Sequence, residues 1–287
     1  MKRDVKGIIR EMTLEEKAGM CSGKDFWHLK GVERLGIPEV MVSDGPHGLR
    51  KQAAEADHLG LNESIKAVCF PTACATACSF DRDLLEEMGE RIGDECQAED
   101  LSVILGPAVN IKRSPLCGRN FEYYSEDPLV AGKSGAAMVR GMQSEHIGAS
   151  VKHFCCNNKE TNRKDSDSRV SERALREIYL KAFEIIVKEA DPYTIMSSYN
   201  LINGVQASEN KDLLTGILRG EWDFKGMVTT DWWTHGEHYR ETKAGNDIKM
   251  ANGYEERVQE AFEKGYITRD EIALCAKRIL TMILRMD

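Results

Sequence analysis

Short apolar segments alternate along this chain with longer segments whose apolar residues recur at helical spacing. The short segments have the length and the β-branched content of buried strands. They cover residues 39–43, 103–106, 149–152, 194–197 and 227–230, with weaker candidates at 68–70 and 247–250. Between them, residues 81–96 and 171–188 place their apolar side chains on one helix face. A final helix is predicted after the capping-box spacing Thr268-Arg-Asp-Glu271.

Strands that alternate with helices predict a parallel sheet, and about this many units predict its closure into a barrel. The expected fold class is therefore α/β, a (β/α)8 TIM-like barrel with an irregular or incomplete first unit. The 287 residues suit one such barrel, which typically needs about 250 residues. We find no linker, repeat or low-complexity stretch, so residues 1–287 are predicted to form a single domain.

Composition and charge narrow the range of partners. A net charge of −8 disfavours a nucleic-acid partner, which requires a basic face. No apolar run approaches the roughly 20 residues of a membrane span, and the opening Met1-Lys-Arg lacks the apolar stretch of a signal peptide. The nine cysteines are odd in number and scattered. Reduced thiols and a cytoplasmic location are therefore expected.

The sequence predicts neither a cofactor nor a metal site. It contains no GxGxxG fingerprint and no P-loop, the two glycine-rich motifs that bind nucleotide phosphates. His235-Gly-Glu-His238 is a conceivable metal motif, but Gly236 weakens the helix that would align the two imidazoles. A solvated loop near the mouth of a pocket is the favoured interpretation.

Asp231 ends the apolar segment 227–230 and is followed at once by Trp232 and Trp233. A carboxylate at a strand end beside flat apolar rings suits a nucleophile that faces the anomeric carbon of a sugar. An Asp in this place is also typical of the N-cap of a following helix. The residue alone does not decide between the two.

The other predicted strands also end in polar or ionisable residues. Because the active site of such a barrel lies at the carboxyl ends of its strands, we expect these side chains to ring one pocket. They can bind sugar hydroxyls bidentately, and the cations among them lower the pKa of nearby carboxyl groups. A lysine in this setting equally suits a Schiff-base aldolase. The residues are Asp44, Arg50, Asn110, Arg113, Arg119, Lys152, His153, Tyr199, Asn200, Asp231, Trp232, Asp247 and Lys249.

Several long motifs follow one another in a specific order. They include Val42-Ser-Asp44-Gly-Pro-His-Gly-Leu-Arg50, Gly106-Pro-Ala-Val-Asn-Ile-Lys-Arg113, Arg119-Asn-Phe-Glu122, Lys152-His153-Phe154, Asn158-Lys-Glu-Thr-Asn-Arg163, Met196-Ser-Ser-Tyr199-Asn200 and Thr230-Asp231-Trp232. From about Met12 to the C-terminus the chain resembles glycoside hydrolase family 3, and within it the bacterial β-glucosidases. The domain it resembles is the N-terminal-type barrel, and no second α/β domain is expected within residues 1–287.

The resemblance implies a retaining β-glucosidase that hydrolyses terminal non-reducing β-D-glucosides through a covalent glycosyl-Asp intermediate. It implies that Asp231 is the nucleophile and that Trp232 stacks beneath the glycone. It further implies that the glycone is held by Asp44, Arg50, Arg119, Lys152, His153, Arg163 and Tyr199. Only the resemblance assigns Arg163 to the site, because the polar sequence of its loop otherwise predicts a solvated segment.

A retaining glycosidase also needs a second carboxyl group as general acid. In multidomain members of the family the second domain supplies this acid, and in the single-barrel N-acetylglucosaminidase branch a His beside an Asp does so. The corresponding loop, Lys164-Asp-Ser-Asp-Ser168, has no His. We therefore expect weakened chemistry, with Glu122, Asp165, Asp167, His235 and His238 as candidate donors. Glu122 is more simply interpreted as a support for Arg119.

The expected ligand is a small saccharide or an aryl glucoside, without nucleic acid or membrane partners. Another sugar specificity, such as xyloside or N-acetylglucosaminide, is the nearest alternative. The expected lack of an acid also leaves open a catalytically silent sugar-binding barrel or a partner subunit of a larger glycosidase. Exposed rings at Trp232, Trp233 and Phe121 would mark the active-site face for self-association or for a second domain.

Overall fold

The computed structural model describes residues 4–53 and 62–286. Its central sheet has the strand order β1-β2-β3-β4-β6-β9, in which β1 is antiparallel to β2 and every later pair is parallel. The strands are β1 (His28–Leu29), β2 (Val40–Asp44), β3 (Val103–Leu105), β4 (Gly148–Phe154), β6 (Thr194–Ser197) and β9 (Met227–Thr230). The predicted strand segments from 39 to 230 are thus confirmed, apart from residues 68–70.

Isolated backbone bridges carry the pairing on from β9 and back to β1. Thr229 pairs with Ile248, Lys249 with Ser22, and Gly23 with Leu29 of β1. The weaker strand candidate at 247–250 therefore contributes bridges rather than a strand. The resulting ring confirms a TIM-like barrel whose first unit is irregular, because β1 is antiparallel and the segment at 22–23 pairs only through bridges.

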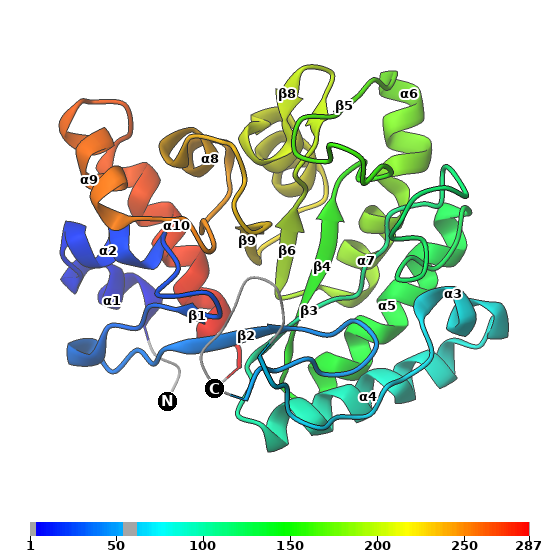
Figure 1. The fold of residues 1–287 in the computed structure, drawn as a ribbon. Helices are drawn as coiled ribbons and strands as arrows, with labels where there is room; N and C mark the ends of the chain where they lie inside the picture. Colours follow the sequence, from blue (N-terminus) through cyan, green and yellow to red (C-terminus); the bar gives the residue numbers. More distant parts are fainter. Residues whose placement is uncertain (1–3, 54–61, 287) are drawn as a thin grey trace.

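Helices flank the ring of strands in two groups, as Figure 1 shows: one group lies beside β3 and β4, and the other beside β1 and β9. The first group contains α3 (Ala73–Thr76), η2 (Ala77–Ser79), α4 (Arg82–Ala98), α5 (Pro128–Ser144) and α7 (Lys181–Ala190). The second contains α1 (Val5–Glu11), α2 (Leu14–Met20), α8 (His238–Ala244), α9 (Glu255–Glu263) and α10 (Arg269–Ile283). The capping box predicted at Thr268 and Glu271 is confirmed at the start of α10.

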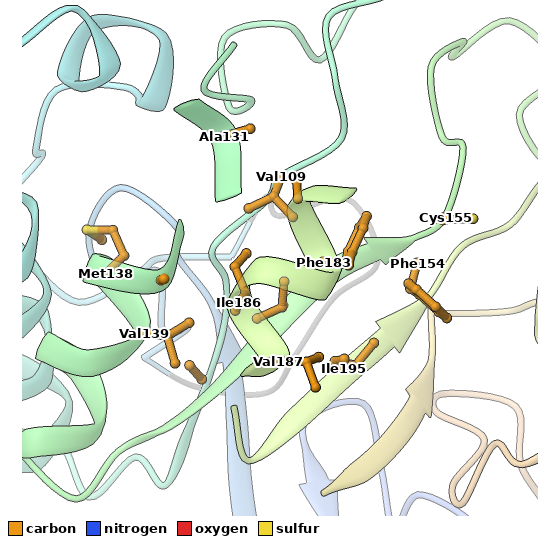
Figure 2. Packing of buried hydrophobic residues seen from close by; sticks show 14 of the residues in the cluster. Val109, Ala131, Met138, Val139, Phe154, Cys155, Phe183, Ile186, Val187 and Ile195 are labelled. Carbon is orange, nitrogen blue, oxygen red and sulfur yellow. The ribbon is translucent and has the colours of Figure 1, made fainter. Parts of the chain in front are cut away.

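One part of the core lies between the strands and the helices α4, α5 and α7, and a second part lies where β2, β3 and β9 pack against α10. In Figure 2, Met138 and Val139 of α5 and Phe183 and Ile186 of α7 point toward one buried cluster. Helices α4 and α5 approach so closely that a Cβ on Gly141 would lie 2.0 Å from the carbonyl oxygen of Glu86. Only glycine permits this contact.

Short elements complete the connections between the strands and helices. A second sheet joins β5 (Asp167–Ser168), β7 (Leu201–Ile202) and β8 (Val205–Gln206) in the loops after β4 and β6. The short 3-10 helices η1 (Glu33–Leu35) and η4 (Ala207–Glu209) and the π-helix η5 (Asp212–Glu221) complete the connections. No helix within the described ranges is long and apolar enough to cross a membrane.

Two predicted elements differ from the structure. Residues 68–70 are irregular, and Val68 is 53% exposed, so the predicted strand there is wrong. The predicted helix over 171–188 begins as expected at the N-cap Ser171, but it is divided into α6 (Glu172–Ala174), the π-helical turn η3 (Leu175–Tyr179) and α7. Apolar periodicity predicts the buried face but not a widened turn within it.

Candidate active site

The candidate site is a cavity of about 330 Å³ that lies at the carboxyl ends of β2, β4 and β9. Asp44 ends β2, Lys152 and His153 lie near the end of β4, and Asp231 directly follows β9. Loops supply Arg50, Arg119, Arg163 and Trp232. Residues that are far apart in the sequence are thus brought to one place by parallel strands that end at the same edge.

Asp231 has one bonded and one unbonded carboxylate oxygen. Its Oδ1 accepts a hydrogen bond from the backbone N–H of Trp232 at 2.8 Å, whereas Oδ2 is buried without a hydrogen bond. Burial raises the pKa of Asp231, and the charges of Arg119 and Lys152 partly oppose that rise. The helix-cap interpretation is wrong, because α8 begins seven residues later behind the N-cap Glu237.

Asp44 stands in a different environment. The Lys152 ammonium donates to Asp44 Oδ1 at 2.7 Å, and the Arg50 guanidinium lies 3.8 Å from Oδ2. Burial alone would raise the pKa of Asp44, but the charge and hydrogen bond of Lys152, together with the charges of Arg119 and Arg50, outweigh it and the pKa is lowered. The ion pair also argues against the aldolase alternative, since a Schiff base requires a free neutral amine.

Arg119 is held on two sides beside Asp231. Its Nε donates to Glu122 Oε1, and its Nη2 lies 3.0 Å from His153 Nε2. The interpretation of Glu122 as a support for Arg119 is therefore confirmed. His153 Nε2 is 3.8 Å from Asp231 Oδ2. Burial, and then the charges of Arg119 and Lys152, hold the pKa of His153 well below its usual value, so the ring is neutral near pH 7.

Tyr199 contacts the site from its edge. Its hydroxyl donates to the carbonyl oxygen of Trp232 at 2.5 Å, and the Arg163 guanidinium lies 4.7 Å from the centre of its ring. Burial and the negative charge of Asp231 raise the pKa of the Tyr199 phenol. Tyr199 thus fixes the loop that carries Trp232 and gives Arg163 an aromatic platform.

An aromatic cluster forms one wall. Trp232 lies 6.2 Å from Phe26 and 5.7 Å from Trp27, measured between ring centroids, and its indole N–H donates to the carbonyl oxygen of Phe26. Trp232 is only 6% exposed, so the expectation that its ring is exposed on this face is wrong, while Phe121 is 53% exposed as expected. Packing against residues 26–27 buries the Trp232 ring.

Sequence reasoning missed several lining residues, namely Phe26, Trp27, Leu105 and Met196. Leu105 and Met196 are apolar strand residues that nothing in the sequence distinguishes from the core. The pair Phe26-Trp27 offered a signal, because two large rings stand there in the polar segment Lys24-Asp-Phe-Trp-His28.

Some predicted pocket residues lie elsewhere. Arg113 is exposed beside a different surface depression. Asp247 is buried between Arg219 and Arg278, and Lys249 is buried against Glu241. Asn110 lies under the site, where its side chain exchanges hydrogen bonds with the backbone of His153. These residues were predicted from strand ends, but their side chains serve the scaffold.

The candidate proton donors are unequally placed. Glu122 is bound to Arg119, Asp167 to Arg169, and His238 is buried with Nε2 donating to the carbonyl oxygen of Cys21. Burial and the charge of Lys249 lower the pKa of His238 to about 4. His235 and Asp165 form an exposed pair, with Nδ1 3.2 Å from Oδ1. Within residues 4–53 and 62–286, no three His, Cys, Asp or Glu side chains are grouped to hold a metal.

The chain is similar to known proteins over nearly its whole length. The family model described as the glycosyl hydrolase family 3 N terminal domain matches residues 32–282. The chain is 49% identical over 283 residues to thermostable beta-glucosidase B of Acetivibrio thermocellus, covering 98% of this chain and 38% of that protein. It is 47% identical over 277 residues to an exo-alpha-(1->6)-L-arabinopyranosidase of Bifidobacterium longum, covering 96% and 37%.

The fold is similar to solved structures as well. Beta-glucosidase 3B of Thermotoga neapolitana in complex with alpha-D-glucose superposes with a TM-score of 0.93 at 38% identity, covering 99% of this chain and 43% of that one. The chain thus spans less than half the length of these relatives. It belongs to glycosyl hydrolase family 3, and residues 32–282 are that family's N-terminal domain.

Proposed function

We propose that this chain is the nucleophile-bearing barrel of a retaining β-glucosidase that hydrolyses terminal β-D-glucosides. The observation that carries the proposal is Asp231 Oδ2, a buried carboxylate oxygen without a hydrogen bond in a cavity lined by cations. A buried acceptor without a partner is costly, which suggests that its partner is a substrate. Relatives named beta-glucosidase support the sugar class.

In the first step, Asp231 Oδ2 attacks the anomeric carbon as the bond to the aglycone oxygen breaks. The aglycone oxygen leaves with the bonding electron pair, and an ester joins the sugar to Asp231. Water then attacks the same carbon, loses one proton to the solvent and releases the Asp231 carboxylate, which gives a product with retained configuration. Arg119 and Lys152 favour the ionised form of Asp231 that the attack requires.

The remaining polar groups suit a glycone. Asp44, kept ionised by Lys152, can accept two hydrogen bonds from neighbouring sugar hydroxyls, while Arg50 and Arg163 can donate. Trp232 offers an apolar face in the same wall. Hydrogen bonds to the sugar 2-hydroxyl strengthen as charge develops at the anomeric carbon, so such contacts contribute to the rate as well as to binding.

We further propose that the chain by itself is short of a strong general acid. Among the candidate donors, His235 and Asp165 form the exposed pair. Their two loops are joined by the hydrogen bond from the Lys164 ammonium to the carbonyl oxygen of Trp233, next to the site residue Trp232. Departure of the aglycone should therefore depend on its own acidity.

One alternative substrate has specific support. A relative at 47% identity is named as an exo-alpha-(1->6)-L-arabinopyranosidase, so an α-L-arabinopyranoside is a second candidate substrate. Its anomeric bond is equatorial, as in a β-D-glucoside. A catalytically silent sugar-binding barrel remains the alternative from a different class.

Turnover of 2,4-dinitrophenyl β-D-glucoside, compared with the matching α-L-arabinopyranoside, tests the proposal. We expect the wild-type chain to release dinitrophenol, and Asp231→Asn to lose activity by about 10³-fold or more. Asp165→Asn, which changes an exposed carboxylate nearby, is the control for charge and should retain activity on this substrate. Sugar binding without dinitrophenol release from either glycoside would instead support the silent barrel.

A further inference from the structure

Two buried residues that do not line the cavity, Tyr123 and Asn157, lie directly behind His153. The Tyr123 hydroxyl oxygen is 3.3 Å from His153 Nδ1, and Asn157 Nδ2 donates to that oxygen at 3.1 Å. The rings of Tyr123 and His153 meet edge-on, with centroids 6.3 Å apart. Tyr123 is fully buried. The hydroxyl therefore interacts with these partners rather than with solvent.

At the Glu160 end of this series of hydrogen bonds, the charges determine which atoms donate and which accept. Arg163 Nη1 donates to Glu160 Oε2 at 3.0 Å, and Glu160 Oε1 lies 3.4 Å from Asn157 Nδ2. A carboxylate only accepts, so the nitrogen of the Asn157 amide is the atom that faces Glu160 and Tyr123. The Tyr123 oxygen consequently accepts from Asn157.

Arg119 sets the direction at the other end. A guanidinium only donates, so His153 Nε2, 3.0 Å from Arg119 Nη2, must be an unprotonated acceptor. A neutral imidazole carries one proton, which is then located on Nδ1 and is donated to the Tyr123 oxygen. The lowered pKa of His153, caused by burial and by Arg119, agrees with a neutral ring.

This arrangement also determines where Arg119 lies. Glu122 accepts from Nε and His153 accepts from Nη2, so the plane of the guanidinium is held from two sides. Arg119 forms no ion pair with Asp231, and Asp231 Oδ2 stays unbonded. Arg119 and Asp231 line the same cavity, so an arginine that was not held would be free to pair with this carboxylate and occupy the oxygen that must attack.

We propose that Tyr123, oriented by Asn157, is a positioning residue for the reaction. It fixes the Nδ1–H tautomer of His153, and the free Nε2 of that tautomer holds Arg119 beside Asp231 without a bond between the two. The kinetic part of this inference rests on the proposed function, whereas the tautomer does not. Removal of the Tyr123 hydroxyl leaves the Nδ1 proton without an acceptor and frees Arg119 to pair with the nucleophile.

Tyr123→Phe removes only this hydroxyl, and Tyr124→Phe is its matched control. Tyr124 is the adjacent residue, is 4% exposed, and its hydroxyl makes no hydrogen bond within the part of the chain that the structure describes. The first measurement is a long-range ¹H–¹⁵N spectrum of the imidazole nitrogens near pH 7. The chain has seven histidines, so His153→Gln suffices to assign the signals of His153.

We expect the Nδ1–H tautomer at His153 in the wild type and in Tyr124→Phe, and the Nε2–H tautomer or a mixture in Tyr123→Phe. An Nε2–H tautomer or a charged ring in the wild type would overturn the proposal, and so would an unchanged spectrum in Tyr123→Phe. If Tyr123→Phe does not fold, the wild-type spectrum still tests the tautomer, and Asn157→Ala tests the hydrogen bonds that run from Asn157 through Tyr123 to His153.

The second measurement is steady-state turnover of dinitrophenyl β-D-glucoside. Misplacement of a catalytic group by about 1 Å can cost a hundredfold, so we expect kcat to fall about tenfold to a hundredfold in Tyr123→Phe, with a smaller change in KM. Tyr124→Phe should stay within about twofold. Equal losses in both variants would indicate a merely structural role. An inactive wild type with the expected tautomer would contradict the proposed function but not the positioning of His153 by Tyr123.

Discussion

Two buried charge clusters at the carboxyl end of the barrel differ in one respect. In the first, around Lys249, the ammonium donates to Glu241 at 2.6 Å, to Thr234 Oγ1 at 2.8 Å and to the carbonyl oxygen of Gly236 at 2.9 Å. In the second, around Lys152, the ammonium binds Asp44, but Asp231 keeps an unbonded oxygen. Burial of a lysine beside a carboxylate is common to both clusters.

The difference between the Lys249 and Lys152 clusters shows that a buried ion pair alone does not identify a functional site. The Lys249 cluster is satisfied internally, since Thr234 Oγ1 also donates to the second oxygen of Glu241. It has no capacity left for a ligand, and it anchors the loop between Asp231 and α8. The cavity around Lys152 leaves acceptors and donors for a substrate. An incomplete set of hydrogen bonds beside a cavity therefore separates a candidate site from a structural ion pair.

The largest expected effect concerns the aglycone. Because general acid assistance contributes about 10²–10⁴-fold, the chain by itself should hydrolyse dinitrophenyl β-glucoside better than cellobiose by a factor of that order, from kcat/KM measurements. Azide should accelerate turnover by intercepting the glycosyl-enzyme. Equal rates for the two substrates would show that a general acid is present, and His235→Gln would then be the first variant to measure.

The pH profile follows from the same account. The raised pKa of Asp231 means that its carboxylate is protonated at a higher pH than an ordinary aspartate, and a protonated nucleophile is inactive. The acidic limb of kcat/KM should therefore lie above the usual Asp range of about 4. The basic limb, which reports deprotonation of a general acid, should be flat on the activated substrate.

Loss of a partner in the satisfied cluster should cost stability. Lys249→Met leaves Glu241 buried without a countercharge, and we expect the free energy of unfolding to fall by about 3–5 kcal/mol in a denaturant titration. Lys24→Met, which breaks the exposed pair with Glu39, is the matched control and should leave the free energy of unfolding nearly unchanged, because solvent screens that pair. Equal, small effects would contradict the structural role of Lys249.

Asp44→Ala should affect the reaction instead. The hydrogen bonds between Asp44 and sugar hydroxyls would tighten in the transition state. We therefore expect the transition state to lose about 3 kcal/mol of stabilisation, so that kcat/KM falls roughly 150-fold and kcat shares the loss. A rise in KM with unchanged kcat would identify Asp44 as a peripheral binding group. The comparison with Lys249→Met separates catalytic loss from loss of stability.

The sequence predicted the barrel because its strands are short, apolar and separated by amphipathic helices. It placed Asp44, Lys152 and Asp231 correctly at strand ends, since that position follows from local patterning alone. It did not separate Asp247 and Lys249 from them, because the direction of a side chain depends on partners such as Arg219 and Glu241 that come from other elements. Local patterning therefore predicts position but not partners.

Other features depend on contacts that no periodicity records. The burial of Trp232 results from packing against Phe26 and Trp27, roughly 200 residues earlier in the chain. The tautomer of His153 depends on Arg119 and Tyr123, which meet it only in the folded barrel. The π-helical turn in 175–179 likewise lies within a segment whose pattern is regular.

The central claim is that Asp231 forms the covalent intermediate. Incubation with 2,4-dinitrophenyl 2-deoxy-2-fluoro-β-D-glucoside should trap it, because the fluorine slows both steps while the activated leaving group still allows the first. We predict a stoichiometric increase in mass by one fluoroglucosyl group, located on the peptide that contains Asp231 and absent from Asp231→Asn. Labelling of a different residue, or turnover without any trapped ester, would contradict the account.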